Sequence, residues 1–354
     1  MFRIGIDLGG TNIAAGVVDD FGNLLRKSSV PTKADRAPGE IIEDIISLCY
    51  EVCEINNISI ESVVSIGIAV PGGVDDASGQ IIFTPNIPFS GINIVNLLSQ
   101  KFENTRIGVI NDANAALLAE LIVGSAKGMQ NAVMITIGTG IGGAIAINGK
   151  IVSGSNGAAG ELGHIVIQRN GKQCSCGRRG CFEKYASATA LIELTKQEIS
   201  KCSDTGEYTE MSKAQQINAR VAFDAYKLGD NAAKRVIDEY IDALTCGIIS
   251  LINAFQPDVF VIGGGVSGEK EFLIDLIQPF IDKEDYARDY KKRSEIETAL
   301  RGNDAGVVGP LLHNLLSKNS NELHLGGRIW IPFMLQDIEI RILILLLRQL
   351  HTHL

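Results

Sequence analysis

The feature that most constrains the fold is a glycine turn between two apolar segments, which occurs once in each half of the chain. In the first half, "FRIGIDL" (2–8) and "IAAGVV" (13–18) read as strands on either side of "GGTN". In the second half, "NAVMITIGTGIGGAIAING" reads as strand, glycine turn and strand. Alternating helix and strand patterns follow each turn, so the sequence predicts two similar α/β halves around a cleft.

Size and composition narrow the class of protein. The chain has 354 residues, of which 45% are hydrophobic and 21% charged, as is typical of a folded two-domain protein. The net charge of −9 and the lack of a Lys/Arg block argue against a nucleic-acid partner. The N-terminus lacks the pattern of a secretion signal, and the apolar run 342–347 is too short to span a bilayer. We therefore expect a cytoplasmic protein with no membrane partner.

The two turns carry groups that suit phosphate. In "DLGGTN", Gly9 and Gly10 let backbone N–H groups approach an anion, and Thr11 adds a hydroxyl. Asp7 could reach a phosphate-bound Mg²⁺ through water. "GTGIGG" (138–143) offers the same chemistry with Thr139, and "IGGGVSG" (262–268) follows a third strand.

The glycines also partly fit two other nucleotide-binding motifs. Gly138, Gly140 and Gly143 fit the dinucleotide fingerprint, but that motif needs a helix next, and "AIAING" reads as a strand and turn. A P-loop motif is absent from the sequence. Plain hairpin turns remain an alternative. Two turns in equivalent places, with a third glycine segment, favour a nucleotide.

A carboxylate lies where a strand meets a helix. "VINDANAALLAE" places Asn111 and Asp112 at the end of a strand, where open α/β sheets bind ligands. Asp112 could be the N-cap of the helix, or its second oxygen could face the cleft as a base. The helix N-terminus would keep that carboxylate ionised.

A cysteine cluster predicts a metal. Cys174, Cys176 and Cys181, with His164 ten residues before the first, match a closed tetrahedral zinc site. Cysteine redox chemistry is the competing interpretation, but C-x-x-C is absent. Glu161 and Glu183 bracket the cluster, so the metal would also fix two carboxylates that suit sugar hydroxyls. The alternative is that both are ordinary surface acids.

Taken together, these motifs resemble those of bacterial-type glucokinases of the ROK family, within the hexokinase–actin superfamily. The resemblance runs from about residue 4 to residue 316. It rests on "DLGGTN", "PGGVD", "NDANAALLAE", "GTGIGGAIAINGKI", "GAAGELGH", "CSCGRRGCFEKYAS" and "IGGGVS". It implies a two-domain actin-like (ribonuclease H-like) ATPase fold. The expected parts are a small domain over 1–111, a large domain over 112–303, a returning helix over 304–318 and an apolar tail over 319–354 with no assigned function.

The resemblance also implies roles for residues. Asp112 would be the base acting on the sugar hydroxyl. The sugar would be held by Asn111, Glu161, His164 and Glu183, with Gly72 in the loop beneath it. The ATP phosphates would lie against Gly9, Gly10, Thr11, Asn12, Thr139 and Gly140, and adenosine against Gly263, Gly264 and Gly265. His164 would bind zinc through one ring nitrogen and offer the other to the sugar.

The implied activity is ATP-dependent phosphorylation of a hexose, with glucose expected first, in a homodimer or homotetramer using Mg²⁺ and structural Zn²⁺. Kinases for N-acetylmannosamine, fructose or allose would use nearly the same residues, and the family includes sugar-responsive repressors. Those carry a helix-turn-helix before the first glycine turn, which here begins at residue 7. "PNIPFSGINI", around Phe89, replaces a loop that often carries Trp and helps to shape the sugar pocket.

Overall fold

The computed structural model describes residues 2–19, 23–75 and 77–319. Internal contacts divide the chain into Met1–Asn314 and Leu315–Leu354, and the account below concerns the first part. Almost all of the apolar tail expected over 319–354 lies outside the described residues. Within them, no helix is long and apolar enough to cross a membrane. The predicted domain boundaries after 111 and 303 stay predictions.

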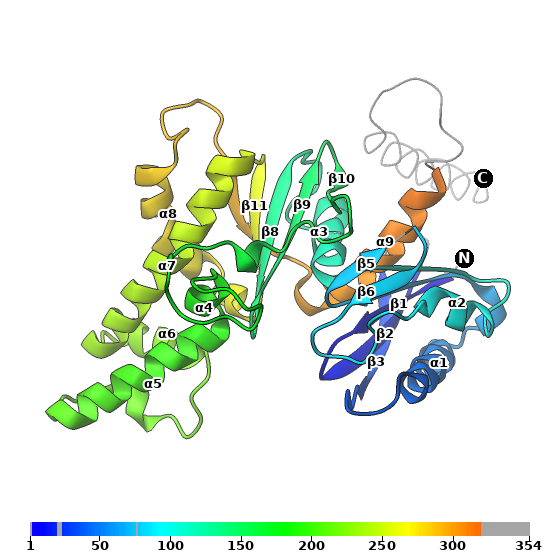
Figure 1. Ribbon diagram of the computed structural model, residues 1–354, viewed down its shortest axis with the longest axis horizontal. Helices are drawn as coiled ribbons and strands as arrows, with labels where there is room; N and C mark the ends of the chain where they lie inside the picture. Colours follow the sequence, from blue (N-terminus) through cyan, green and yellow to red (C-terminus); the bar gives the residue numbers. More distant parts are fainter. Residues whose placement is uncertain (1, 20–22, 76, 320–354) are drawn as a thin grey trace, which may run out of the picture. The chain divides into compact units, whose positions relative to one another are not determined.

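The first half is built on a five-stranded sheet of order β3-β2-β1-β4-β7. β1, β4 and β7 are parallel, while β2 and β3 are antiparallel additions (Figure 1). The helix α1 (Pro38–Ile55) packs its buried isoleucines on this sheet. The strands are β1 (Phe2–Leu8), β2 (Asn12–Val18), β3 (Leu24–Pro31), β4 (Val63–Val70) and β7 (Arg106–Asn111).

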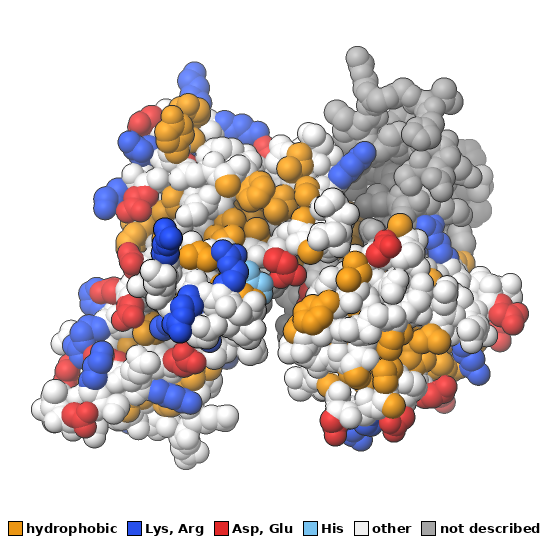
Figure 2. Space-filling view, viewed as in Figure 1, with side chains coloured by type: hydrophobic (Ala, Val, Ile, Leu, Met, Phe, Trp, Pro, Cys, Tyr) orange, Lys and Arg blue, Asp and Glu red, His pale blue; other side chains and the backbone are white. Residues whose placement is uncertain are grey.

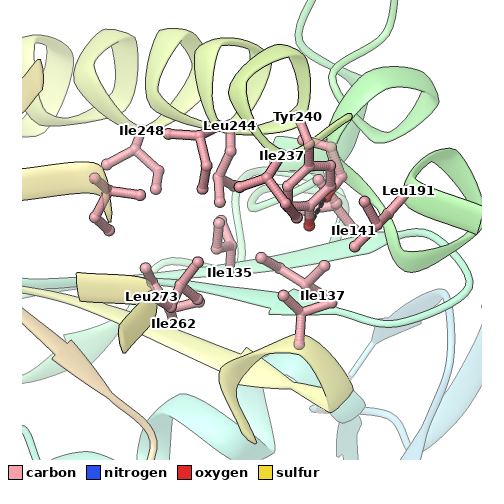
Figure 3. Packing of buried hydrophobic residues seen from close by; sticks show 14 of the residues in the cluster. Ile135, Ile137, Ile141, Leu191, Ile237, Tyr240, Leu244, Ile248, Ile262 and Leu273 are labelled. Carbon is pink, nitrogen blue, oxygen red and sulfur yellow. Dashed lines mark hydrogen bonds between the residues drawn. The ribbon is translucent and has the colours of Figure 1, made fainter. Parts of the chain in front are cut away.

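The second half repeats this order, as β10-β9-β8-β11-β12. Its core forms where Ile237, Leu244 and Ile248 of α7 (Asn231–Phe255) meet Ile135 and Ile262 of the sheet (Figure 3). The strands are β8 (Ala132–Ile137), β9 (Ile141–Ile147), β10 (Lys150–Ile151), β11 (Val259–Gly264) and β12 (Glu295–Thr298). The repeated order confirms the predicted pair of similar α/β halves.

Further helices complete the second half. They are α4 (Glu183–Ala186), α5 (Ala188–Thr205), α6 (Arg220–Lys227) and α8 (Glu271–Glu284). α5 and α6 pack with α7 around Phe223 and Tyr240, whose rings meet edge to face. Phe255, the last residue of α7, is exposed, whereas the apolar residues Ile241, Leu244 and Ile248 of the same helix are buried.

The last helix, α9 (Ala305–Asn319), lies against the first sheet. Gly16, Gly5 and Gly67 stand in register across β2, β1 and β4. A Cβ atom on Gly5 would lie 1.7 Å from the Val307 carbonyl oxygen, and one on Gly67 would lie 2.5 Å from the backbone of Pro310. The glycine row therefore makes the groove in which the helix backbone fits.

A buried acid joins the two ends of the second half. Glu120, on α3 (Asp112–Val123), is 0% exposed. Its carboxylate accepts hydrogen bonds from the N–H groups of Ser125 (2.7 Å), Leu300 (3.1 Å) and Arg301 (2.8 Å). It thereby fastens the segment that leads from β12 into α9 to the end of α3.

The loop that holds Gly72 leads into a small two-stranded sheet. "PGGVDDASGQ" contains β5 (Gly73–Asp75), which pairs with β6 (Gln80–Phe83). The strands are too short for the sequence to show a clear alternation. After them, α2 (Ile94–Ser99) is capped by Asn93, whose side chain accepts from the Asn96 N–H.

Candidate functional site

The first glycine turn joins β1 to β2. The Gly9 N–H donates to the Asn12 carbonyl at 3.0 Å. Thr32 holds the turn from outside, because its hydroxyl donates to the Gly9 carbonyl at 2.6 Å and its N–H to the Thr11 carbonyl at 2.9 Å. Gly10 and Thr11 are exposed, and in the described part of the chain nothing accepts from their N–H groups. The turn thus offers free donors to an anion.

The second turn, between β8 and β9, is one residue shorter but is also held by hydrogen bonds to its carbonyls. The Gly138 N–H donates to the Gly140 carbonyl at 3.0 Å. The Gly138 carbonyl accepts from the Ala188 N–H at 2.9 Å, and the Thr139 carbonyl accepts from the Thr189 hydroxyl at 2.8 Å. No described residue accepts from the N–H groups of Thr139 and Gly140. β9 follows directly, which confirms that this is not a dinucleotide fingerprint.

The third glycine segment lies beside the second turn. Gly264, the last residue of β11, pairs with Ile137, just before Gly138. Its φ of +83° and the Ile137 backbone 2.5 Å from an added Cβ both require glycine. Gly263 is buried within the strand, whereas Gly265 has open space around it. Two of the three predicted nucleotide segments are therefore adjacent.

Asp112 is the first residue of α3, not its cap. The N-cap is Asn111, whose Oδ1 accepts from the Asn114 N–H at 3.0 Å. The Asn111 amide also donates to the Gly72 carbonyl at 3.0 Å and to Asp112 Oδ1 at 3.1 Å. Asp112 Oδ1 accepts a further bond from the Ala113 N–H at 2.8 Å. Among the described residues, Asp112 Oδ2 has no hydrogen-bond partner.

Three carboxylates are close enough to influence one another. Burial, with smaller contributions from the charges of Asp7 and Glu161, raises the pKa of Asp112 to about 6, although the hydrogen bond from the Ala113 N–H opposes the shift. Burial also raises the pKa of Asp7 to about 6. Asp112 is exposed to solvent. Its carboxylate is therefore surrounded by protein on most sides but open to solvent on one side. Desolvation is the largest influence on this pKa, yet a pKa of about 6 still leaves the carboxylate mainly ionised at neutral pH.

The predicted metal ligands come together. The ligand atoms of His164, Cys174, Cys176 and Cys181 all lie within 4.8 Å of one another. Cys176 Sγ and Cys181 Sγ are 3.6 Å apart, and Cys174 Sγ and His164 Nδ1 are 3.7 Å apart. A zinc tetrahedron with bonds of about 2.3 Å has edges of about 3.8 Å, so the set fits Zn²⁺. A disulfide, with sulfurs about 2.05 Å apart, is not formed.

Glu183 lies between the metal cluster and the second turn. Its Oε1 is 3.0 Å from Cys174 Sγ and 3.8 Å from His164 Nδ1. A Cβ on Gly140 would meet its Oε2 at 2.6 Å. Glu161 stands at the start of the short 3₁₀ helix that ends at His164. Figure 2 shows a histidine among acidic side chains on the displayed face.

Several positions differ from sequence-based expectation. Phe89, in the loop expected to shape the sugar pocket, is 0% exposed and belongs to the core of the first half. Thr32, Thr189 and Glu120 were not singled out by the sequence. Thr189 follows Ser187, the N-cap of α5, and this "S-x-T" start was the only local signal. The roles of Thr32 and Glu120 become visible only through their contacts with distant segments.

Comparison with known proteins agrees with this architecture. The ROK family model matches residues 3–314. A glucokinase of Thermotoga maritima is 32% identical over 315 residues, which cover 86% of this chain and 95% of that protein. A solved ROK family glucokinase of Streptomyces griseus, in complex with glucose and AMPPNP, is 32% identical with a TM-score of 0.75. That match covers 88% of this chain and 98% of the other.

A ROK hexokinase of Thermus thermophilus is 30% identical, with a TM-score of 0.72 and coverage of 90% and 100% of the two chains. The expected hexokinase-type fold is thus confirmed at the level of both sequence and structure. The chain belongs to the ROK family.

Proposed function

We propose that this protein is an ATP-dependent hexose kinase that transfers the γ-phosphoryl group of ATP to a sugar hydroxyl, with glucose as the first substrate to test. Relatives named glucokinase match along nearly their whole length. The solved relative from Streptomyces griseus holds glucose and AMPPNP. The two glycine turns and the carboxylates described above supply the chemistry that such a transfer needs.

The free oxygen of Asp112 carries the proposal. Because Oδ1 is held by the Asn111 amide and the Ala113 N–H, the carboxylate has a fixed orientation. Oδ2 is left to accept the proton of an incoming alcohol. With a pKa of about 6, the carboxylate is mainly ionised at neutral pH yet basic enough to assist.

The phosphoryl transfer forms one bond and breaks another. The sugar oxygen bonds to the γ-phosphorus, the bond from that phosphorus to the β,γ-bridging oxygen breaks, and ADP leaves. The hydroxyl proton passes to Asp112. The free N–H groups of Gly10, Thr139 and Gly140 would stabilise charge on the phosphates. Asp7 would hold Mg²⁺ through water, and the ion would supply further charge neutralisation.

The metal cluster would position the sugar. His164 turns Nδ1 toward Cys174 Sγ, so Nδ1 would be the zinc ligand and Nε2 would remain for a sugar hydroxyl. Burial raises the pKa of the Cys181 thiol to about 12, and a bound cation would keep it deprotonated. Glu161 and Glu183 would accept sugar O–H groups. Asn111, whose amide is already engaged, would mainly orient Asp112.

An ADP-release assay tests the proposal. The purified protein is given ATP and Mg²⁺ with glucose, N-acetylmannosamine, fructose, mannose or allose. We expect sugar-dependent ADP release, strongest with glucose. Asp112→Asn should lower its rate by about 10²–10⁴-fold, whereas Asp238→Asn, a change to an exposed acid on α7, should leave it intact. Glucose binding without ADP release would instead indicate a sugar sensor and refute the kinase. The expected homo-oligomer and cytoplasmic location stay predictions.

A further inference from the structure

We propose that Thr32 and Thr189 are positioning residues for the nucleotide, each fixing the carbonyl side of one glycine turn so that the turn's N–H groups face the phosphates. This inference rests on the proposed function, since it concerns how that site binds ATP. Neither threonine lies in a glycine turn itself.

The two anchors are built alike although they come from unrelated elements. Thr32 follows the edge strand β3 and is 0% exposed, and its hydroxyl and N–H bond to carbonyls of the first turn. At the second turn the two bonds come from neighbouring residues, because the Thr189 hydroxyl donates to the Thr139 carbonyl and the Ala188 N–H donates to the Gly138 carbonyl. In each half, one hydroxyl and one N–H hold two carbonyls.

The geometry of the peptide bond converts these contacts into donor orientation. In a trans peptide, the carbonyl of one residue and the N–H of the next point in opposite directions. Holding the Gly9 carbonyl therefore turns the Gly10 N–H away from Thr32. Holding the carbonyls of Gly138 and Thr139 likewise turns the N–H groups of Thr139 and Gly140 away from α5.

Those are the N–H groups that lack an acceptor in the described part of the chain. Glycine has little intrinsic preference for one peptide orientation, so an unanchored turn could rotate a carbonyl toward the phosphates. A carbonyl oxygen there would repel the anion. The anchors remove that alternative before the nucleotide arrives, which lowers the ordering cost of binding.

The backbone around each of the two threonines is itself held by a hydrogen bond. Thr189 is the second residue of α5, whose N-cap Ser187 is buried and accepts from the Ala190 N–H at 3.1 Å. The Thr32 carbonyl is itself held by the Arg36 guanidinium at 3.0 Å. The hydroxyls therefore act from fixed positions.

Calorimetric titration of the full chain with AMPPNP and Mg²⁺ tests the inference. Thr32→Val and Thr189→Val keep the side-chain shape but remove the hydroxyl, and each should weaken AMPPNP binding about 3- to 10-fold, as expected for one hydrogen bond. Thr32→Ser and Thr189→Ser should restore most of the affinity. Glucose affinity, measured without nucleotide, should change less than about twofold.

Thr195→Val is the matched control. Thr195 lies on the same helix as Thr189, is buried, and donates its hydroxyl to the Leu191 carbonyl at 2.7 Å, away from the turn. It should leave AMPPNP affinity unchanged. If Thr32→Val does not fold, Thr32→Ser and the two variants of the half-exposed Thr189 still test the positioning role.

The possible failures are distinguishable. If the wild-type chain binds no AMPPNP, the proposed function is wrong. If it binds AMPPNP and both valine variants bind equally well, the positioning role is overturned. The role is also overturned if the valine variants lose glucose affinity as much as AMPPNP affinity, because the change would then be a general loss of structure.

Discussion

Asp112→Asn should separate sugar binding from phosphoryl transfer. The asparagine oxygen can take the place of Oδ1 and keep the hydrogen bonds from Asn111 and Ala113. Its amide group then occupies the place of Oδ2, where it can bind a hydroxyl but cannot take its proton. We expect kcat to fall by about 10²–10⁴ and the KM for sugar to change less than about threefold.

The pH profile gives a second measure of the same group. Asp112 must be ionised to act as a base, so its activity is full above its pKa and is lost as the pH falls through it. With a pKa of about 6, roughly one-tenth of the enzyme is competent at pH 5. The residual rate of Asp112→Asn should be nearly independent of pH between 5 and 8.

Stability supplies the control for this variant. The folded-state pKa of Asp112 is raised from 3.8, so ionisation of the carboxyl costs folding free energy as the pH rises through its pKa. The melting temperature of Asp112→Asn at pH 8 should therefore equal or exceed that of the wild type. A kcat within a few-fold of wild type would refute Asp112 as the base. A residual rate that still falls tenfold per pH unit would assign the acid limb to another group, such as Asp7.

Three further predictions concern the metal and the fold. Cys176→Ser should weaken zinc binding at least about tenfold, measured by metal content after dialysis, whereas Cys246→Ser, an exposed cysteine outside the cluster, should keep one zinc per chain. Glu120→Ala leaves three backbone N–H groups without their acceptor, so it should lower the free energy of unfolding in urea by about 2–4 kcal/mol. A decrease below about 1 kcal/mol would contradict the role of Glu120 in holding the segment before α9 against α3. Gly5→Ala should destabilise by about 3 kcal/mol because α9 cannot approach, while Gly39→Ala on α1, with open space around it, should be neutral or stabilising.

The features that depend on local sequence pattern could be predicted from the sequence. The two glycine turns lie between strands because apolar runs of strand length flank them, and the metal cluster forms because its ligands lie within 18 residues of chain. The start of α3 was placed correctly, but the cap was not. Asp and Asn are equally good caps, and only the hydrogen bond to the Asn114 N–H distinguishes them.

The features that could not be predicted from the sequence depend on contacts between distant segments. Thr32 looks like any residue after a strand until its hydroxyl is seen on the Gly9 carbonyl. Glu120 lies in a helix with a good pattern, yet two of its hydrogen-bond donors, Leu300 and Arg301, are 180 and 181 residues away in the chain. The raised pKa of Asp112 likewise depends on burial by distant parts of the chain and, to a smaller extent, on the charges of Asp7 and Glu161. Pattern and propensity carry no information about such partners.

The groove made by Gly5 and its neighbours has a consequence for biosynthesis. Its occupant, around Val307, leaves the ribosome about 300 residues after Gly5, which at usual translation speeds is roughly 15 to 60 s later. Throughout that interval the nascent N-terminal sheet keeps an uncovered apolar surface. Newly made chains should therefore depend on chaperones until α9 emerges.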